Sequence, residues 1–488
     1  MRTKRDNQQW MLDLALNMRG RVQNFERDDP ETPTRAHNYR MLPKMWRKKA
    51  EHDEALAKTA EKNGFKMTAL EHYDHAVESY RMAQHPIYFD DNPVKIYLTN
   101  KLKEMVDRRS ALAPYPIERV EVPFDDGKTI SCLLHLLPDR RKAPCVIYVP
   151  GMDQTKEYFP RVMNSLGVNR GMHVISMDGP GQGNSNIQKI RAIADNYERA
   201  GAAVIDYLEK REEVDSDKIG IYGVSMGSYW SLRLASYDNR PAALASGVAT
   251  FNPNNTIFSV SSPRFKQMFM YMAGIDDEDK FDAMASNMTM DQHAKKIKSP
   301  SLTIMGEYDP LNYMEDGLEI WEQINGPKEL WILEDDFHSP PAIKGLGGND
   351  VYFYMADWLK DAFAGKIAND TLINKKIEYV LDKVGMTGFE KRPVHTLSGG
   401  QKQRLTIACA LISNRNFILL DEPTALLDQT SQLKVLQTIK NLTSDHKKPL
   451  SALWITHRYE ELTYADAVAE LKNGFLSSWQ EPSKFQYN

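Results

Sequence analysis

The feature that most constrains this chain is a series of short apolar runs that alternate with helical stretches between about residues 116 and 363. The runs are IERVEVPF, ISCLLHLL, CVIYVPG, HVISMDGPG, IGIYGVS, SLTIMGEYD and ELWILED. Strands that alternate with helices form a mostly parallel α/β sheet. In such sheets the chemistry lies at the carboxyl ends of the strands. We therefore search for a functional site there.

The segments on either side of this alternation have different patterns, which predict three domains in the 488 residues. Residues 1–115 carry apolar and small side chains at helical spacing, with a helix pair hinged at Asn63-Gly64 and ended by Pro86. This helical domain either serves only as packing, similar to a pair of tetratricopeptide helices, or forms a cap over an active site. In the second case its helices, with Tyr73 and Tyr80, would pack beside that site. The α/β domain covers 116–363, and a separate tail covers 364–488, with the junction at 364–369.

Composition excludes several classes of protein. The chain has 42% hydrophobic and 26% charged residues, with no apolar run long enough to cross a bilayer and no signal-peptide pattern after its first residues. We therefore expect a cytoplasmic protein without membrane insertion. Residues 116–363 hold 25 Lys and Arg against 36 Asp and Glu, which disfavours nucleic acid as a partner. Three scattered cysteines, Cys132, Cys145 and Cys409, form neither a disulfide framework nor a zinc site.

The pentapeptide Gly223-Val224-Ser225-Met226-Gly227 lies between the strand IGIY and the helical run SYWSLRLAS. In a strand-turn-helix, a serine is held at a sharp corner with its hydroxyl exposed, and the flanking glycines avoid steric clashes. The alternative is a turn that serves only tight packing. The context favours Ser225 as a nucleophile.

A serine nucleophile requires a base, and the base requires a carboxylate that orients it. When the acid follows the serine and the histidine comes last, the order is that of α/β-hydrolases. Asp309 lies 84 residues after Ser225, at the end of the strand SLTIMG, and His338 lies 29 residues further, after ELWILED. His338 is the only histidine between Asp309 and the tail. Glu307 remains an alternative acid.

Acyl transfer also requires donors for the oxyanion. We expect the backbone amide of Met226 as the first donor and that of Met152, or of Asp153, as the second, after a turn at Gly151. The segment 178–183, DGPGQG, lacks the spacing of a nucleotide-binding loop and is interpreted as structural. This chemistry needs no metal or organic cofactor.

On these motifs, residues 116–363 resemble the α/β-hydrolase superfamily. With the run AEKNGF and HYDHAVESYRMAQHP, residues of roughly 20–363 resemble the subfamily of 2,6-dihydroxypseudooxynicotine hydrolase and of esterases related to the fermentation-respiration switch protein. The resemblance implies a helical cap before the core and a Ser225-Asp309-His338 triad. It implies hydrolysis of an ester, or of a carbon-carbon bond next to a ketone, in a small-molecule substrate. It also favours a homodimer.

The tail carries a second set of motifs. The pentapeptide LSGGQ, with Ser398, Gly399, Gly400 and Gln401, resembles the signature of ABC-transporter ATPases. FILLDE resembles the Walker B strand with Asp421 and Glu422, residues 425–428 resemble the D-loop, and His457 resembles the switch histidine.

The tail lacks the motif that such an ATPase needs to hold nucleotide. The sequence contains no G-x-x-x-x-G-K-[ST], so the amide cradle and lysine for the phosphates are missing. The tail is therefore expected not to hydrolyse ATP alone. It is either a truncated fusion passenger, which we favour, or a segment that binds an intact ABC ATPase subunit.

The sequence thus predicts a serine hydrolase. Two other classes stay open: an interaction protein whose tail docks on an ATPase, and an acyltransferase or cyclase that uses the same triad with another acceptor.

Overall fold

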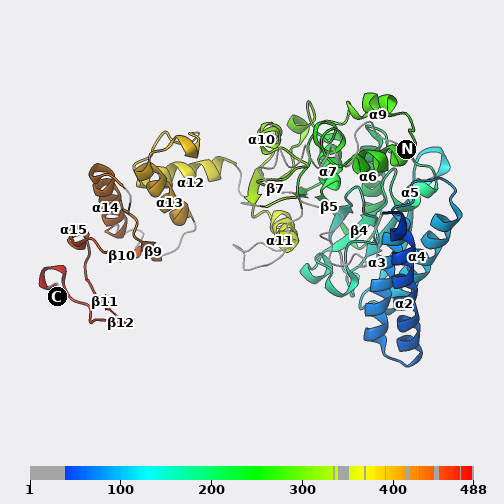
Figure 1. Ribbon diagram of the computed structural model, residues 1–488, viewed down its shortest axis with the longest axis horizontal. Coiled ribbons are helices and arrows are strands. Elements are labelled where there is room, and N and C mark those ends of the chain that lie inside the picture. Colours follow the sequence, from blue (N-terminus) through cyan, green and yellow to red (C-terminus); the bar gives the residue numbers. More distant parts are fainter. Residues whose placement is uncertain are drawn as a thin grey trace. The chain divides into compact units, whose positions relative to one another are not determined.

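The computed structural model describes residues 39–333, 336–338, 351–367, 370–390, 392–412, 417–425, 427–444, 450–472 and 474–485. The chain divides into two compact units, residues 1–367 and 368–488 (Figure 1). The first 38 residues of the predicted helical domain, residues 368 and 369 of the predicted junction, and residue 426 of the D-loop motif lie outside the described residues. No helix in the described part of the chain is long and apolar enough to span a bilayer.

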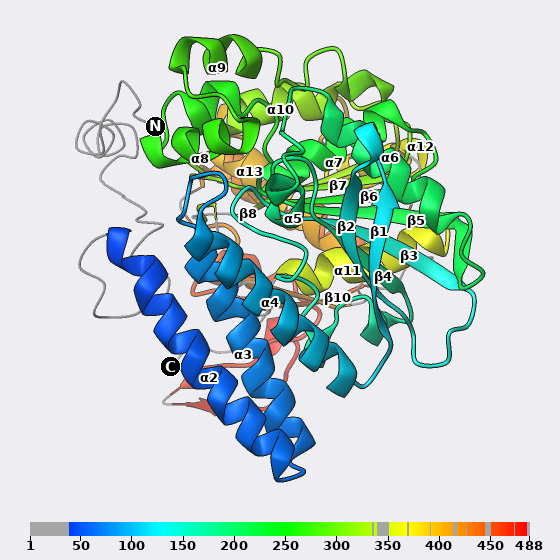
Figure 2. The same cartoon turned by 90° about the vertical axis from the view of Figure 1, so that its right-hand side faces the viewer.

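Three antiparallel helices precede the sheet and lie side by side in Figure 2: α2 (Leu42–Lys62), α3 (Lys66–Gln84) and α4 (Pro93–Leu112). The break between α2 and α3 falls at Asn63-Gly64, as the sequence predicts. The third helix begins where the side chain of Asn92 accepts hydrogen bonds from the N–H groups of Val94 and Lys95, which satisfies two donors of its first turn.

Tyr73 and Tyr80 occupy the interior of this helical bundle. Both rings are fully buried in its core, and their hydroxyls donate to Glu61 and Glu54 of α2 at 2.6 and 2.5 Å. The polar ends of both side chains thus find partners within the bundle itself, and the expectation that the helices at 55–84 pack beside the site stays a prediction.

The sheet has eight strands in the order β1-β2-β4-β3-β5-β6-β7-β8. The β1/β2 and β2/β4 pairs are antiparallel and all others are parallel, which confirms the predicted, mostly parallel α/β sheet. The strands are β1 (Ile117–Pro123), β2 (Thr129–His135), β3 (Ala143–Val149), β4 (His173–Met177), β5 (Val214–Val224), β6 (Ala243–Gly247), β7 (Ser301–Gly306) and β8 (Lys328–Leu333).

Strand β6 is absent from the sequence prediction although it lies in the middle of the sheet. Its residues, ALASG, have low strand propensity. Small side chains are needed there because a helix packs closely: a Cβ at Gly247 would lie 2.8 Å from the sulfur of Met355. Tertiary packing, rather than local preference, makes this segment a strand.

Helices cover both faces of the sheet. Alternate strand residues point to opposite faces, so Ile147 and Ile221 pack in one core with α6 and α7, while Tyr148 and Tyr222 pack in another with α11. The helices of this unit after the bundle are α5 (Gly183–Ile187), α6 (Asn196–Leu208), α7 (Met226–Tyr237), α8 (Pro263–Ala273), α9 (Glu278–Ala285), α10 (Met314–Glu322) and α11 (Val351–Phe363).

The second unit has its own small core. Strands β9 and β10 pair in parallel, and Ile418 and Leu420 pack with Val435 and Ile439 of α14. Its elements are α12 (Asp370–Lys383), α13 (Gly399–Ile412), β9 (Phe417–Asp421), α14 (Gln429–Thr443), β10 (Ser451–Ile455), α15 (Tyr459–Leu462), β11 (Leu471–Lys472) and β12 (Phe475–Leu476).

Candidate active site

Ser225 occupies the corner between β5 and α7. Strand β5 ends at Val224 and α7 begins at Met226, and the backbone of Ser225 has φ 58° and ψ −127°. A positive φ is costly for a residue with a Cβ and persists only where surrounding structure holds it. Here the Ser225 N–H donates to the carbonyl of Gly247 in β6 at 3.0 Å.

The two glycines of the motif are required by close contacts. A Cβ at Gly227 would lie 2.2 Å from the carbonyl oxygen of Val149, and one at Gly223 would lie 2.2 Å from Oγ of Ser231. Both distances are far below van der Waals contact. The glycines therefore let α7 approach β3 and hold Ser225 at the edge of the sheet.

Asp309 follows β7 and His338 follows the neighbouring strand β8. The turns that come after these two strands contact each other. The Tyr308 N–H donates to the carbonyl of Asp336 at 2.9 Å. A Cβ at Gly306 would lie 2.3 Å from the carbonyl oxygen of Phe337. The absence of a side chain at Gly306 thus allows the two turns to bring acid and base together.

The structure joins the three predicted side chains in one hydrogen-bonded chain. Oγ of Ser225 lies 2.6 Å from Nε2 of His338. Nδ1 of His338 lies 2.7 and 3.0 Å from Oδ2 and Oδ1 of Asp309. Because a carboxylate only accepts, we place the proton on Nδ1, which leaves Nε2 to accept from the serine. Asp309 and His338 are 5% and 8% exposed, and Oδ1 of Asp309 also accepts from the N–H of Leu311 at 2.8 Å.

The predicted oxyanion donors lie in two segments next to Ser225. Met226 is the first residue of α7, so its N–H has no acceptor within the helix. In the loop after β3, a Cβ at Gly151 would lie 3.5 Å from the Cβ of Ser225. The side chain of Met152 is buried in the core. Donation from the amides of Met226 and Met152 stays a prediction.

Residues 178–183 support the loop after β3 through hydrogen bonds. The side-chain amide of Gln182 donates to the carbonyl of Gly151 at 2.7 Å. Asp178 accepts from both the backbone N–H and Nζ of Lys156, at 2.9 and 2.6 Å. Burial opposes the charge of Lys156, but attraction to Asp178 and Glu157 outweighs it and holds the pKa of Lys156 above its usual value. These contacts agree with the interpretation of the segment as structural.

A side chain that sequence reasoning missed reaches the same loop from the helical bundle. Nη1 of Arg81, in α3, donates to the carbonyl of Asp153 at 3.0 Å, and its guanidinium lies 5.0 Å from the ring centre of Tyr158. Burial disfavours the charge of Arg81, yet the attraction of Glu78 at 2.5 Å outweighs burial and raises the pKa of Arg81. Because 72 residues separate Arg81 from Asp153, no local sequence signal indicates this contact.

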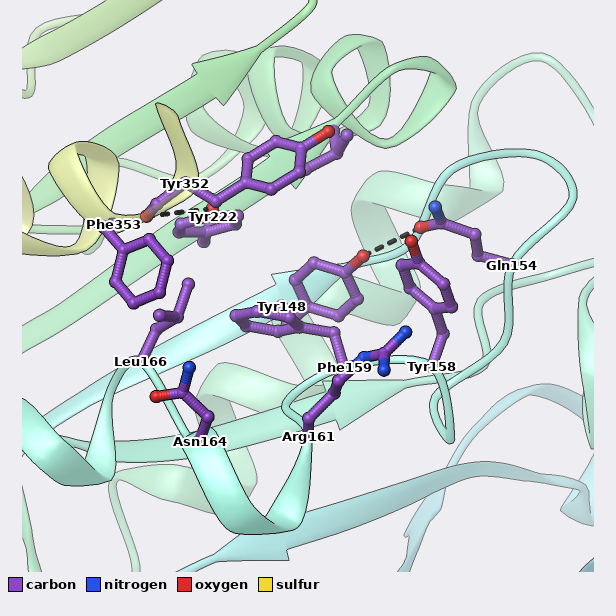
Figure 3. A pocket seen from close by; sticks show the side chains of 11 residues that line it. Tyr148, Gln154, Tyr158, Phe159, Arg161, Asn164, Leu166, Tyr222, Tyr352 and Phe353 are labelled. Atoms are coloured by element: carbon purple, nitrogen blue, oxygen red, sulfur yellow. Dashed lines mark hydrogen bonds between the residues drawn. The ribbon is translucent and has the colours of Figure 1, made fainter. Parts of the chain in front are cut away.

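An aromatic cavity of about 270 Å³ lies next to the β5–α7 corner that holds Ser225, on the α11 face of the sheet (Figure 3). Val224, which directly precedes Ser225, contributes to its wall, whereas none of the three side chains of the hydrogen-bonded chain lines it. The hydroxyl of Tyr148 donates to Gln154, which also accepts from the N–H of Gly151. The other lining residues are Tyr158, Phe159, Arg161, Asn164, Leu166, Tyr222, Tyr352 and Phe353.

In the second unit, the ABC-like motifs cluster at helix starts and strand ends. Ser398 and Gln401 form a reciprocal cap at the start of α13, in which each side chain accepts from the other's backbone N–H. Gly399 and Gly400 begin that helix. Asp421 ends β9, and Oε1 of Glu422 lies 2.7 Å from Nδ1 of His457, beyond the end of β10.

Comparison with known proteins assigns the larger unit to a family. The family described as "Esterase FrsA-like" matches residues 39–304. The 2,6-dihydropseudooxynicotine hydrolase of Paenarthrobacter nicotinovorans is 29% identical over 278 residues, which are 55% of this chain and 71% of that protein. A crystal structure of 2,6-dihydroxy-pseudo-oxynicotine hydrolase superposes with a TM-score of 0.59 at 23% identity and covers 73% of this chain and 94% of that one. This confirms the α/β-hydrolase fold.

The ABC transporter family matches residues 319–425. The first part of that match, residues 319–367, belongs to the first unit. It includes β8, which pairs with β7 in the hydrolase sheet. ABC transporter I family member 10 of Arabidopsis thaliana is 43% identical over 106 residues, 22% of this chain and 39% of that protein. The chain thus spans about two fifths of this relative, and the resemblance of the tail to ABC ATPases is confirmed for that portion.

Proposed function

Because the chain belongs to the FrsA-like esterases and is an α/β-hydrolase, we propose that it cleaves a carbonyl substrate with Ser225 as nucleophile, His338 as general base and acid, and Asp309 as the group that orients His338. The observation that carries this proposal is the continuous hydrogen-bonded chain of 2.6 and 2.7 Å through these side chains. It lies at the carboxyl ends of β5, β7 and β8, where such sheets place their chemistry.

In the proposed reaction, Oγ of Ser225 attacks the carbonyl carbon while Nε2 of His338 takes its proton. The negative oxygen that forms is held by the amides of Met226 and Met152. His338 then returns the proton to the leaving group, an alcohol oxygen or a carbon, and an acyl-enzyme remains. Water attacks the acyl-enzyme by the same route in reverse and restores Ser225.

The relatives and the nearby cavity support the substrate class that we propose. One relative is named for hydrolysis of 2,6-dihydropseudooxynicotine, and the aromatic cavity of Figure 3 offers rings with a few polar groups. We propose an ester, or a ketone with a cleavable carbon-carbon bond. An acyltransferase or cyclase would use the same residues with an acceptor other than water.

Labelling with a fluorophosphonate tests the nucleophile, and a panel of chromogenic esters and aryl ketones, with and without added alcohols, tests the reaction. We expect a single adduct on Ser225 and products that match hydrolysis. Products that contain the added alcohol would instead identify a transferase. An adduct on another residue would contradict the proposed site.

We expect Arg81→Met to lower kcat by roughly 10- to 100-fold, because the loop that presents the amide of Met152 loses its hydrogen bond at the carbonyl of Asp153. Arg81 would act as a positioning residue, since it does not reach the reacting atoms. Steady-state kinetics should show a change in kcat with little change in KM.

The control for this prediction also removes the charge of Glu78, the half-buried carboxylate that pairs with Arg81. Arg81→Met alone leaves Glu78 without its cation, which destabilises the fold, so the double variant Arg81→Met/Glu78→Gln separates stability from catalysis. Arg47→Met, which removes an exposed ion pair with Glu51, should leave kcat unchanged. If kcat of the double variant equals that of the wild type, Arg81 has only a structural role.

For the tail we propose docking on an intact ABC ATPase as a second function. One face of its two-stranded sheet is apolar and exposed, with Phe417, Leu419, Leu453 and Ile455 each 37% to 59% accessible. A pull-down with the tail against a purified ABC ATPase tests this proposal. Binding that is lost in Leu419→Lys would support it, and lack of binding would leave the tail as a passenger.

We predict that removal of residues 368–488 leaves hydrolysis within about twofold and that ATP does not shift the melting temperature of the full chain. Asp421 and Glu422 can arrange magnesium and water only around phosphates held by a P-loop, and the chain encodes none. ATPase activity that disappears in Glu422→Gln would contradict this prediction.

A further inference from the structure

A second cluster of chemically active side chains lies in the helical bundle. Asp53 projects from α2, and His72 and His75 project from α3, the neighbouring antiparallel helix in Figure 2. The histidines are three residues apart and therefore share a helix face. One ligand atom from each of the three side chains lies within 4.8 Å of the other two. Small changes of rotamer would bring all three around one ion.

The Asp53 carboxylate is buried with weak compensation. The residue is 8% exposed. Among the described residues, its one hydrogen-bond contact is Nδ1 of His72 at 3.4 Å, which is longer than an ordinary hydrogen bond. A buried carboxylate is costly unless a cation or several donors compensate for its lost hydration. A metal ion between Asp53 and the two imidazoles would supply that compensation.

A cavity of about 380 Å³ borders this cluster and is lined by Asp53 and His75. Its wall holds four carboxylates and three cationic side chains. Three of the carboxylates already have cations, since Asp74 pairs with Arg109, Glu157 with Lys156 and Glu78 with Arg81. Lys49, one helical turn before Asp53, and Arg161 also line the cavity and would oppose a bound cation; the other lining residues are Val77, Glu78 and Tyr158.

We propose that Asp53, His72 and His75 bind a divalent transition-metal ion such as Zn²⁺. Two imidazole nitrogens with one carboxylate oxygen are a donor set that suits zinc, and three protein ligands leave a position for water or a solute from the cavity. The ion would link α2 to α3. It is separate from the Ser225 site and has no part in the hydrolysis proposed there.

The test is a titration of chelator-treated, full-length protein with Zn²⁺ by calorimetry, with Co²⁺ absorption as a second measure of tetrahedral coordination. We expect one ion per chain and a higher melting temperature with Zn²⁺. His72→Ala and His75→Ala should each weaken binding by at least about tenfold, because loss of an outer-shell partner alone typically costs 10- to 100-fold. Asp53→Asn should do the same.

His52→Ala is the matched control, since His52 lies exposed on α2 next to Asp53 but is not part of the cluster. It should bind Zn²⁺ like the wild type. His75 is exposed, so His75→Ala remains folded and informative even if Asp53→Asn does not. Failure of the wild type to bind Zn²⁺, or equal affinity in the wild type and the His72→Ala/His75→Ala variant, would overturn the proposal.

Discussion

We expect Ser225→Ala to lower turnover of every substrate of the wild-type protein by at least roughly 10⁴-fold, the loss typical when a nucleophile that acts together with its base is removed. The substitution deletes Oγ and its 2.6 Å contact with His338. It leaves the Cβ and the positive-φ backbone of the corner as they are. Initial rates on the best ester or ketone of the panel measure the loss, and thermal melting, which we expect to be unchanged, measures whether the fold is retained.

Ser236→Ala is the matched control for this variant. Ser236 lies on the same helix, α7, and donates to the carbonyl of Arg233 at 2.7 Å, away from the hydrogen-bonded chain. Its activity should stay within about threefold of the wild type. If Ser225→Ala keeps more than a tenth of wild-type turnover, the nucleophile is another residue.

The sequence predicted those parts of the molecule that depend on local pattern and chain order. The alternation of strands and helices gave the parallel sheet, and the order serine, acid, histidine selected the three side chains that the structure joins. The three side chains come together because the carboxyl ends of parallel strands meet at one edge. Residues that follow β5, β7 and β8 are therefore brought near one another by topology alone.

The features that the sequence did not predict depend on contacts between distant segments. Strand β6 has weak local preference and exists because it fits between β5 and β7 beneath α11. Arg81 reaches the loop after β3 only because α3 packs against the sheet domain. Tyr73 and Tyr80 have the spacing of a face that could cover a site, but packing turns them into the bundle. Periodicity identifies a buried face without identifying what buries it.

The sequence left two candidates for the acid, and the geometry separates them. Both carboxylate oxygens of Asp309 contact Nδ1 of His338, and Oδ1 also accepts from the N–H of Leu311. The backbone N–H of Glu307 instead donates to the carbonyl of Leu333 in β8, which extends the pairing of β7 with β8. Asp309 thus has the position that orients the imidazole, which leads to a prediction for its amide variant.

Asp309→Asn is expected to lower kcat by about 10⁴-fold, the loss that follows when the base is held in the wrong tautomer. The asparagine oxygen must take the place of Oδ1 to accept from Leu311, so the amide N–H₂ faces Nδ1 of His338. Nδ1 then accepts, the imidazole proton moves to Nε2, and the base can no longer take the proton of Ser225. Glu307→Gln, the control measured in the same assay, should stay within about threefold of the wild type. The opposite pattern would make Glu307 the orienting acid.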